Sequence, residues 1–112
     1  MAGVVKRGDV VTVSAPGDYE KPRPAVVVQS DALNTNDSVL VAPFTSTLRD
    51  APIYRLTVEP SASNGLKLPS QIMVDKITTI ARGKCGKVIG RLDDRVILAL
   101  NRLISAVCGI AD

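Results

Sequence analysis

"KPRPAVVVQSD" (residues 21–31) places one arginine between two prolines and then continues into an unbroken block of β-forming residues. A continuous apolar run such as residues 25–30 is typical of a central strand covered on both faces. Pro24 disfavours helical backbone at the residue before it, so Arg23 is held extended, and Pro22 removes a backbone donor just upstream. The segment therefore predicts a buried strand that begins with a rigidly presented cation.

Short strands are predicted on both sides of this run. Residues 53–59 alternate with period two, as a strand with one wet face does, and residues 71–80 read as a long strand bent near Asp75. The remaining strand-like segments are residues 9–15, 39–44 and 86–92. Turn-forming residues separate them at residues 15–24, 31–38, 45–52 and 60–70, the last centred on the Asn64–Gly65 turn signal.

The periodicity becomes helical after Asp93, which is suited to an N-cap, and ends before Gly109, which is suited to termination. Asp94 adds a favourable charge to the first turn. Six aliphatic residues share one stripe: Val96, Ile97, Leu100, Leu103, Ile104 and Val107. Burying them supplies on the order of 10 kcal/mol before conformational entropy is subtracted. The prediction is a mainly β fold, a curled antiparallel sheet of five to seven strands closed by one C-terminal helix, in a single domain over residues 1–112.

Composition excludes several classes of protein. Nearly half of the 112 residues are apolar, which argues against intrinsic disorder. One Phe, two Tyr and no Trp predict an aliphatic core and argue against an aromatic platform for stacking bases.

The two cysteines, Cys85 and Cys108, have no histidine to join them in a zinc site. Two free thiols in a reducing cytoplasm are expected, although a disulfide is an open alternative. Charges interrupt the apolar N-terminal residues, and no segment approaches a membrane span, so no membrane association and a cytoplasmic location are expected.

The net charge is +3, and the cations are unevenly distributed. Residues 76–91 contain no acid and five cations: Lys76, Arg82, Lys84, Lys87 and Arg91. Such a run suits contact with a polyanion, where its effect would be salt-dependent affinity with little sequence choice. An ordinary solvated loop is the alternative.

The chain has no glycine-rich phosphate loop, no nucleophile elbow and no histidine for a catalytic triad. Acid–base chemistry is left to carboxylates, Arg, Lys, Thr, Ser and Tyr. Such a set suffices to cleave RNA without metal, because the ribose 2′-hydroxyl is itself the nucleophile. The planar guanidinium fork suits a doubly charged phosphorane, since it can bind two oxygens at once.

Five motifs occur in order: "KRGDVVTV", "RPAVVVQSD", "VLVAPFTSTLR", "LPSQIMVDKITTI" and "IGRLDD". Together they resemble the pattern of the MazF/PemK (Kid) toxins from about Val5 to the end of the chain. The resemblance implies a small SH3-like barrel that forms a homodimer. It implies an endoribonuclease that cleaves single-stranded RNA without metal or cofactor, and an antitoxin whose C-terminal segment lies across the dimer.

The resemblance also implies site residues. The catalytic arginine before a proline matches Arg23 in "PRP", and the threonine after the third strand matches Thr45 in "PFTS", with Ser46 beside it for RNA binding. Asp75 in "VDK" matches an acid that acts as a base in the PemK branch. The chain departs from the family where arginines are usual, with Met73 two residues before the acid and Thr78 in "ITTI".

The first loop departs as well, since "APGDYEKPRP" replaces a longer family loop. Asp18 or Glu20 is predicted to stand in for its acid. The further residues predicted to bind RNA are Lys21, Lys76, Thr78, Arg82 and Lys84.

Less specific interpretations stay open for each residue. Arg23 would then be a surface cation, Thr45 and Ser46 turn caps, and Asp75 a salt-bridge acid. For the whole chain, one alternative is a toxin of the same fold that binds gyrase, as CcdB does. CcdB-like chains end in "WGI", whereas this one ends in "CGIAD". A catalytically impaired RNA-binding homologue is another alternative.

Overall fold

The computed structural model describes residues 4–14 and 21–110, and the elements below belong to those residues. The strands are β1 (Asp9–Val13), β2 (Arg23–Val27), β3 (Ser38–Thr45), β4 (Arg55–Val58), β5 (Ser70–Met73), β6 (Thr78–Ala81) and β7 (Cys85–Arg91). The helices are α1 (Asp94–Val107) and three single 3₁₀ turns, η1 (Asp31–Leu33), η2 (Val74–Lys76) and η3 (Arg82–Lys84).

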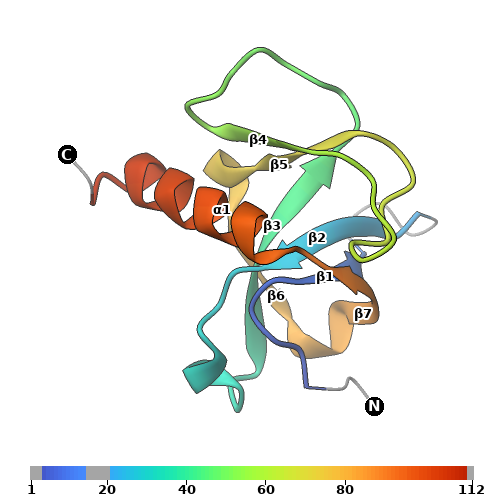
Figure 1. The fold of residues 1–112 in the computed structure, drawn as a ribbon. Helices are drawn as coiled ribbons and strands as arrows, with labels where there is room; N and C mark the ends of the chain where they lie inside the picture. The colour runs from blue at the N-terminus through green and yellow to red at the C-terminus, as the bar shows by residue number, and fades with distance from the viewer. Residues whose placement is uncertain (1–3, 15–20, 111–112) are drawn as a thin grey trace.

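Antiparallel pairing joins the strands in the order β4-β5-β3-β2-β1-β7, and β6 also pairs with β3 (Figure 1). The long β3 makes this possible, because its first half pairs with β6 while its last two residues pair with β5. The predicted fold class, mainly β with five to seven antiparallel strands and a C-terminal helix, is confirmed. The strand pairing does not close into a complete barrel, since β4 and β7 end the order. The backbone N–H of Arg91 bridges this gap by donating to the Ser63 carbonyl at 2.7 Å.

Two hydrophobic clusters lie on opposite faces of the central strands. Val10 and Val26 belong to the cluster under α1, whereas their sequence neighbours Val11 and Ala25 belong to the other. Alternate side chains of a strand point to opposite faces, so a strand covered on both faces needs apolar residues throughout. This explains the unbroken apolar run and confirms its prediction as a central strand.

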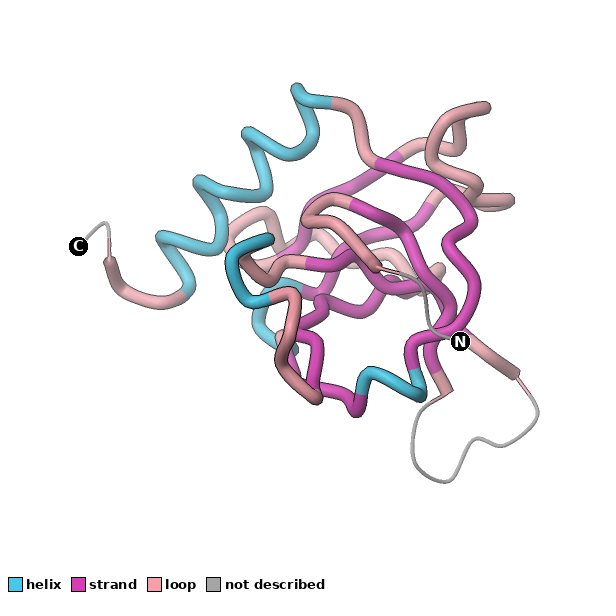
Figure 2. Tube along the Cα trace, turned by 90° about the horizontal axis from the view of Figure 1, so that it is seen from below, coloured by secondary structure: helices cyan, strands magenta, loops and turns pink. Residues whose placement is uncertain are grey.

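The C-terminal helix begins and ends as predicted. The Asp93 carboxylate accepts a hydrogen bond from the Val96 N–H at 2.9 Å, and Gly109 takes a φ of +76° after the last turn. α1 contacts β4 and η2, and Leu100 is the one fully buried residue of the predicted stripe. Val96, Ile97, Leu103 and Ile104 are partly buried against the same cluster, while Val107 remains 36% exposed at the C-terminal end. Figures 1 and 2 show α1 along one side of the strands, with its end projecting beyond them. In the described ranges, no helix combines the length and the apolar character that crossing a membrane requires.

The predicted bend at Asp75 is confirmed, since η2 separates β5 from β6 there. The predicted wet face of residues 53–59 is wrong at one position. Arg55 is only 7% exposed, because its side chain turns inward to hydrogen-bond with Gln71 and with the Thr47 carbonyl.

Candidate active site

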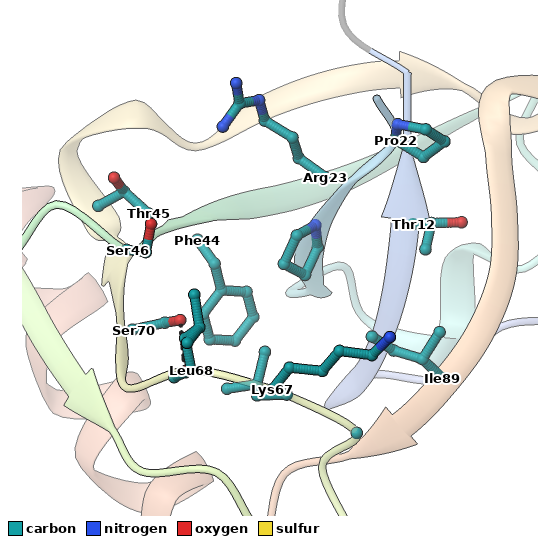
Figure 3. A pocket seen from close by; sticks show the side chains of 13 residues that line it. Thr12, Pro22, Arg23, Phe44, Thr45, Ser46, Lys67, Leu68, Ser70 and Ile89 are labelled. Atoms are coloured by element: carbon teal, nitrogen blue, oxygen red, sulfur yellow. Dashed lines mark hydrogen bonds between the residues drawn. The ribbon is translucent and has the colours of Figure 1, made fainter. Parts of the chain in front are cut away.

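A cavity of about 420 Å³ lies where β2 begins and β3 ends. Its lining comes from several separate segments: Thr12, Pro22, Arg23, Pro24, Phe44, Thr45, Ser46, Gly65, Leu66, Lys67, Leu68, Ser70 and Ile89. Figure 3 shows Arg23 and Lys67 on opposite sides of this cavity, with Thr45 and Ser46 at one end. The structure thus brings together the two residues predicted most directly to act in catalysis.

Arg23 is the first residue of β2 and pairs in register with Val13 of β1. Its side chain is exposed at the cavity, while the strand that follows it is buried from Ala25 onward. Pro24 fixes the extended backbone at this junction, as the sequence predicts. A guanidinium is therefore presented to the cavity from backbone that loses little further freedom when a ligand binds.

Thr45 is the last residue of β3, and its Oγ1 accepts a hydrogen bond from the Thr47 N–H at 3.1 Å. A hydroxyl has one hydrogen to donate and two lone pairs, so this contact leaves the hydrogen of Thr45 available to a ligand oxygen. The turn-capping interpretation of Thr45 is confirmed by the same contact, and it is compatible with a place in the cavity. Ser46 follows directly and also lines the cavity.

The wall opposite Arg23 is the end of the loop between β4 and β5, which carries Lys67 and Leu68. The loop is tied to itself by Asn64, whose Oδ1 accepts from the N–H groups of Ser61 and Leu66 at 3.0 Å each. Ser70 Oγ donates to the Leu68 carbonyl at 2.9 Å. These bonds tie the wall to itself and to the first residue of β5.

The charges at the cavity have one sign. Among the described residues that line it, Arg23 and Lys67 are cationic and none is acidic. Phe44, Leu66 and Ile89 supply apolar surface between them. This combination suits a ligand with both an anionic group and a flat apolar part, such as a nucleotide. Within the described part of the chain, no group of three or more His, Cys, Asp or Glu side chains is placed to hold a metal ion.

Other predicted residues lie away from the cavity lining. Asp75 and Lys76 are exposed on η2, Thr78 is exposed on β6, and Lys84 is exposed on η3. Lys21 is exposed beside Pro22 without lining the cavity, and Asp18 and Glu20 fall outside the described residues.

Arg82 serves the neighbouring loop. Its guanidinium donates to the carbonyls of Asn36, Leu33 and Ser38 at 2.7–3.5 Å, and so it ties residues 33–38 to η3. Its role in RNA binding remains a prediction.

The sequence prediction missed Thr12, Lys67, Leu68 and Ser70 as cavity residues. The one available signal was the Asn64–Gly65 turn, which marked residues 60–70 as a loop. Nothing in the periodicity indicates that this loop folds back against β7 and faces Arg23.

The two cysteines differ in environment. Both are free, as predicted, with Cys85 buried and Cys108 exposed. Burial raises the pKa of the Cys85 thiol; the nearby Arg82 charge opposes this effect and Asp9 adds to it.

The fold and site define a class of protein, a small antiparallel β domain with a cationic cavity suited to a phosphodiester. Comparison with known families agrees: residues 6–108 match the family of PemK-like, MazF-like toxins of type II toxin–antitoxin systems. The chain belongs to this family.

Individual relatives cover nearly the whole chain. The probable endoribonuclease MazF of Mycolicibacterium smegmatis is 38% identical over 108 residues, which are 96% of this chain and 99% of the relative. The Mycobacterium tuberculosis toxin MazF-mt6 is 26% identical, with a TM-score of 0.78 over 90% of this chain and 96% of the other. A chain of a MazE–MazF crystal structure from Deinococcus radiodurans is 17% identical, with a TM-score of 0.76 over 96% of this chain and 99% of the other, and supports the fold alone.

Proposed function

We propose that this chain is the toxin of a toxin–antitoxin system and acts as an endoribonuclease on single-stranded RNA without a metal ion. The observation that carries the proposal is the meeting of Arg23 and Thr45 in one cavity whose described lining is cationic. The match to the toxin family and to a relative described as a probable endoribonuclease supports it.

The reaction is a transfer within the RNA backbone. The 2′-oxygen attacks the adjacent phosphorus, its proton passes to a base, and the bond from phosphorus to the 5′-oxygen breaks as that oxygen gains a proton. The products carry a 2′,3′-cyclic phosphate, which can open to a 3′-phosphate, and a 5′-hydroxyl. Arg23 binds non-bridging oxygens as negative charge accumulates on them, and Thr45 donates its hydroxyl hydrogen to the same group.

The predicted carboxylates are Asp18, Glu20 and Asp75, and the base is expected first at Asp18 or Glu20, because Asp75 lies outside the cavity lining. A base that must be ionised gives the pH–rate profile an acidic limb. Replacing each carboxylate in turn with its amide identifies the base as the residue whose loss removes that limb.

The proposal extends to the assembly. We infer that each chain is a single domain and that two chains form a homodimer. The dimer works in the cytoplasm, where mRNA is found, and a cognate antitoxin inhibits it. One structural neighbour, described as an endoribonuclease in complex with its cognate antitoxin from a mycobacterial species, shares the fold with a TM-score of 0.80 at 20% identity. Light scattering of the purified chain measures the dimer, and co-purification with the protein encoded beside it measures the partner.

The direct test of the activity is cleavage of a defined single-stranded RNA by the purified chain in EDTA. The expected products carry 5′-hydroxyl and cyclic-phosphate ends, and one 2′-deoxy substitution at the cleaved position abolishes the cut. Sequencing RNA ends from cells that express the chain identifies the target sequence. If varied RNAs all stay intact while gyrase is inhibited, the chain is instead a gyrase-binding toxin, and if RNA is bound but never cut, it is an impaired homologue.

A further inference from the structure

The loop between β3 and β4 continues directly from Thr45 and Ser46 of the proposed active site, and its first residues, 46–50, have no regular secondary structure. Two side chains from the neighbouring strands hold it. Gln71 of β5 accepts from the Arg49 N–H at 3.0 Å and donates through Nε2 to the Arg49 carbonyl at 2.9 Å. Arg55 of β4 donates to the Thr47 carbonyl at 3.2 Å.

These contacts form a continuous path to the Thr45 hydroxyl. Gln71 Oε1 accepts from Arg55 Nη1 at 3.2 Å, so the two side chains hold each other as well as the loop. Thr47 is held at both ends, since its carbonyl accepts from Arg55 and its N–H donates to Thr45 Oγ1. Gln71 is also the register partner of Thr45 in the β3–β5 pairing.

The path is buried and polar. Gln71 and Arg55 are 6% and 7% exposed, and Arg55 Nε has no hydrogen-bond partner among the described residues. Burying a charged group in this way is costly, and apolar residues of similar volume are often at least as stabilising. Stability of the fold alone therefore does not account for this pair.

We propose that Gln71 and Arg55 are positioning residues for RNA cleavage, which fix the Thr45 hydroxyl and Ser46 through the backbone of residues 47–49. The inference rests on the proposed function. The position of the Thr45 hydroxyl matters because displacing a reacting group by about 1 Å can cost on the order of 10²-fold in rate.

The test compares Gln71→Leu with Thr57→Val in single-turnover cleavage. Leu keeps the bulk of Gln71 and removes all of its hydrogen bonds. Thr57→Val removes only the contact from Gln71 Nε2 to Thr57 Oγ1, at 3.2 Å, which does not involve the loop. Gln71→Leu is expected to lower the maximal rate about 10- to 100-fold with little change in RNA affinity, and Thr57→Val is expected to leave the rate unchanged. Hydrogen exchange at the Arg49 amide should accelerate in Gln71→Leu alone.

A double-mutant cycle separates positioning from general damage. If Gln71 acts through Thr45, Gln71→Leu has little further effect in a Thr45→Val background, whereas a general loss of stability lowers the rate equally in both backgrounds. Gln71→Glu keeps both acceptor contacts and loses both donor contacts, those to the Arg49 carbonyl and to Thr57 Oγ1, so it should restore part of the rate. This variant keeps the test decisive if the Leu variant does not fold.

Equal losses in both backgrounds, or a wild-type rate in Gln71→Leu, would overturn the positioning role and leave the nuclease assignment intact. Absence of cleavage by the wild-type chain overturns the proposed function, and the positioning role with it.

Discussion

Gly65 packs directly against the backbone of Ile89, so closely that a Cβ on Gly65 would overlap the Ile89 carbonyl. Gly65 also has a φ of +73°, which side-chain-bearing residues rarely adopt. This contact joins the loop after β4 to β7, where strand pairing leaves the sheet open, and it sets the position of Lys67 across the cavity from Arg23.

Gly65→Ala should therefore lower the free energy of unfolding by about 2–5 kcal/mol, because it adds left-handed strain to a backbone clash. Urea denaturation measures this. Gly83→Ala is the matched control, since a Cβ there meets nothing within 4 Å. Equal stability of the two variants would show that the loop does not depend on this contact.

Lys67→Ala should weaken RNA binding, because one contact to a phosphate is lost. The slope of log Kd against log salt concentration should fall by about one, since the missing cation no longer displaces a counterion. Titration at several salt concentrations with a 2′-deoxy RNA measures this without cleavage. Arg102→Ala removes the same charge from the exposed surface of α1. Identical salt slopes for the two variants would remove Lys67 from the RNA site.

Thr45→Val should lower the cleavage rate about 10- to 100-fold, since a hydrogen bond to a charged group contributes roughly 1.5–3 kcal/mol. Thr45→Ser keeps the hydroxyl and should retain most of the activity. Both variants are expected to keep the fold, and unchanged circular dichroism spectra check this. A Val variant as fast as the Ser variant would show that the hydroxyl does not contact the reacting phosphate.

The thiols should react differently with iodoacetamide at neutral pH, with Cys108 modified first and Cys85 protected by burial and by its raised pKa.

The raised pKa of Cys85 also has a consequence for stability. Below the ordinary thiol pKa the folded and unfolded chains both keep the proton. As the pH rises through that value the unfolded chain ionises first, so stability falls. Cys85→Ala should flatten this alkaline loss, whereas Cys108→Ala should not. The same alkaline loss of stability in wild type and Cys85→Ala would show that ionisation of Cys85 does not cause it.

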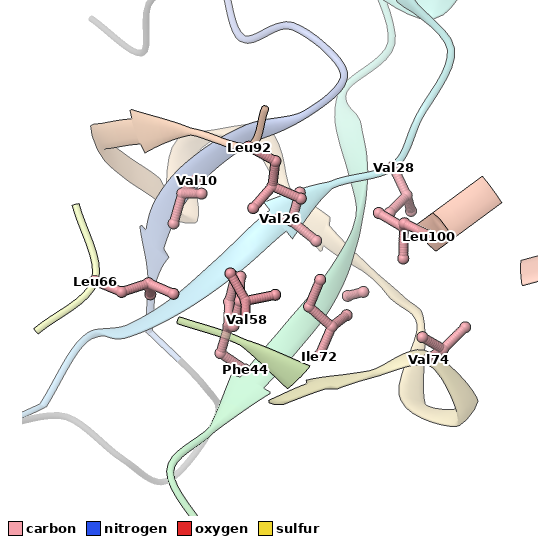
Figure 4. Packing of buried hydrophobic residues seen from close by; sticks show 11 residues of the cluster. Val10, Val26, Val28, Phe44, Val58, Leu66, Ile72, Val74, Leu92 and Leu100 are labelled. Atoms are coloured by element: carbon pink, nitrogen blue, oxygen red, sulfur yellow. The ribbon is translucent and has the colours of Figure 1, made fainter. Parts of the chain in front are cut away.

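Local patterns predicted the fold well where one physical requirement dominated. The valines after Pro24 had to be covered on both faces, and Val26 and Val28 do pack in one cluster with Val10 and Leu100 (Figure 4). The N-cap Asp93 and the terminating glycine fixed the ends of α1 in the same way.

The site was predictable only in part. Arg23 and Thr45 were found through local motifs and a family resemblance, while Lys67 belongs to the cavity because of a long-range contact at Gly65. Arg55 was missed for a similar reason. Its alternation pattern indicated solvent, but its hydrogen bonds to Gln71 and Thr47 form only in the tertiary structure.

The measurement that tests the central claim most directly is single-turnover cleavage of single-stranded RNA in EDTA by wild type, Arg23→Lys and Arg23→Ala. Arg23 is exposed, so its loss should leave folding intact. If its guanidinium stabilises the charge that develops on the phosphate, Arg23→Ala loses about 10²–10³-fold in rate, or roughly 2.7–4 kcal/mol, and Arg23→Lys recovers only part because it lacks the planar fork. A folded Arg23→Ala variant that cleaves at the wild-type rate would contradict the account.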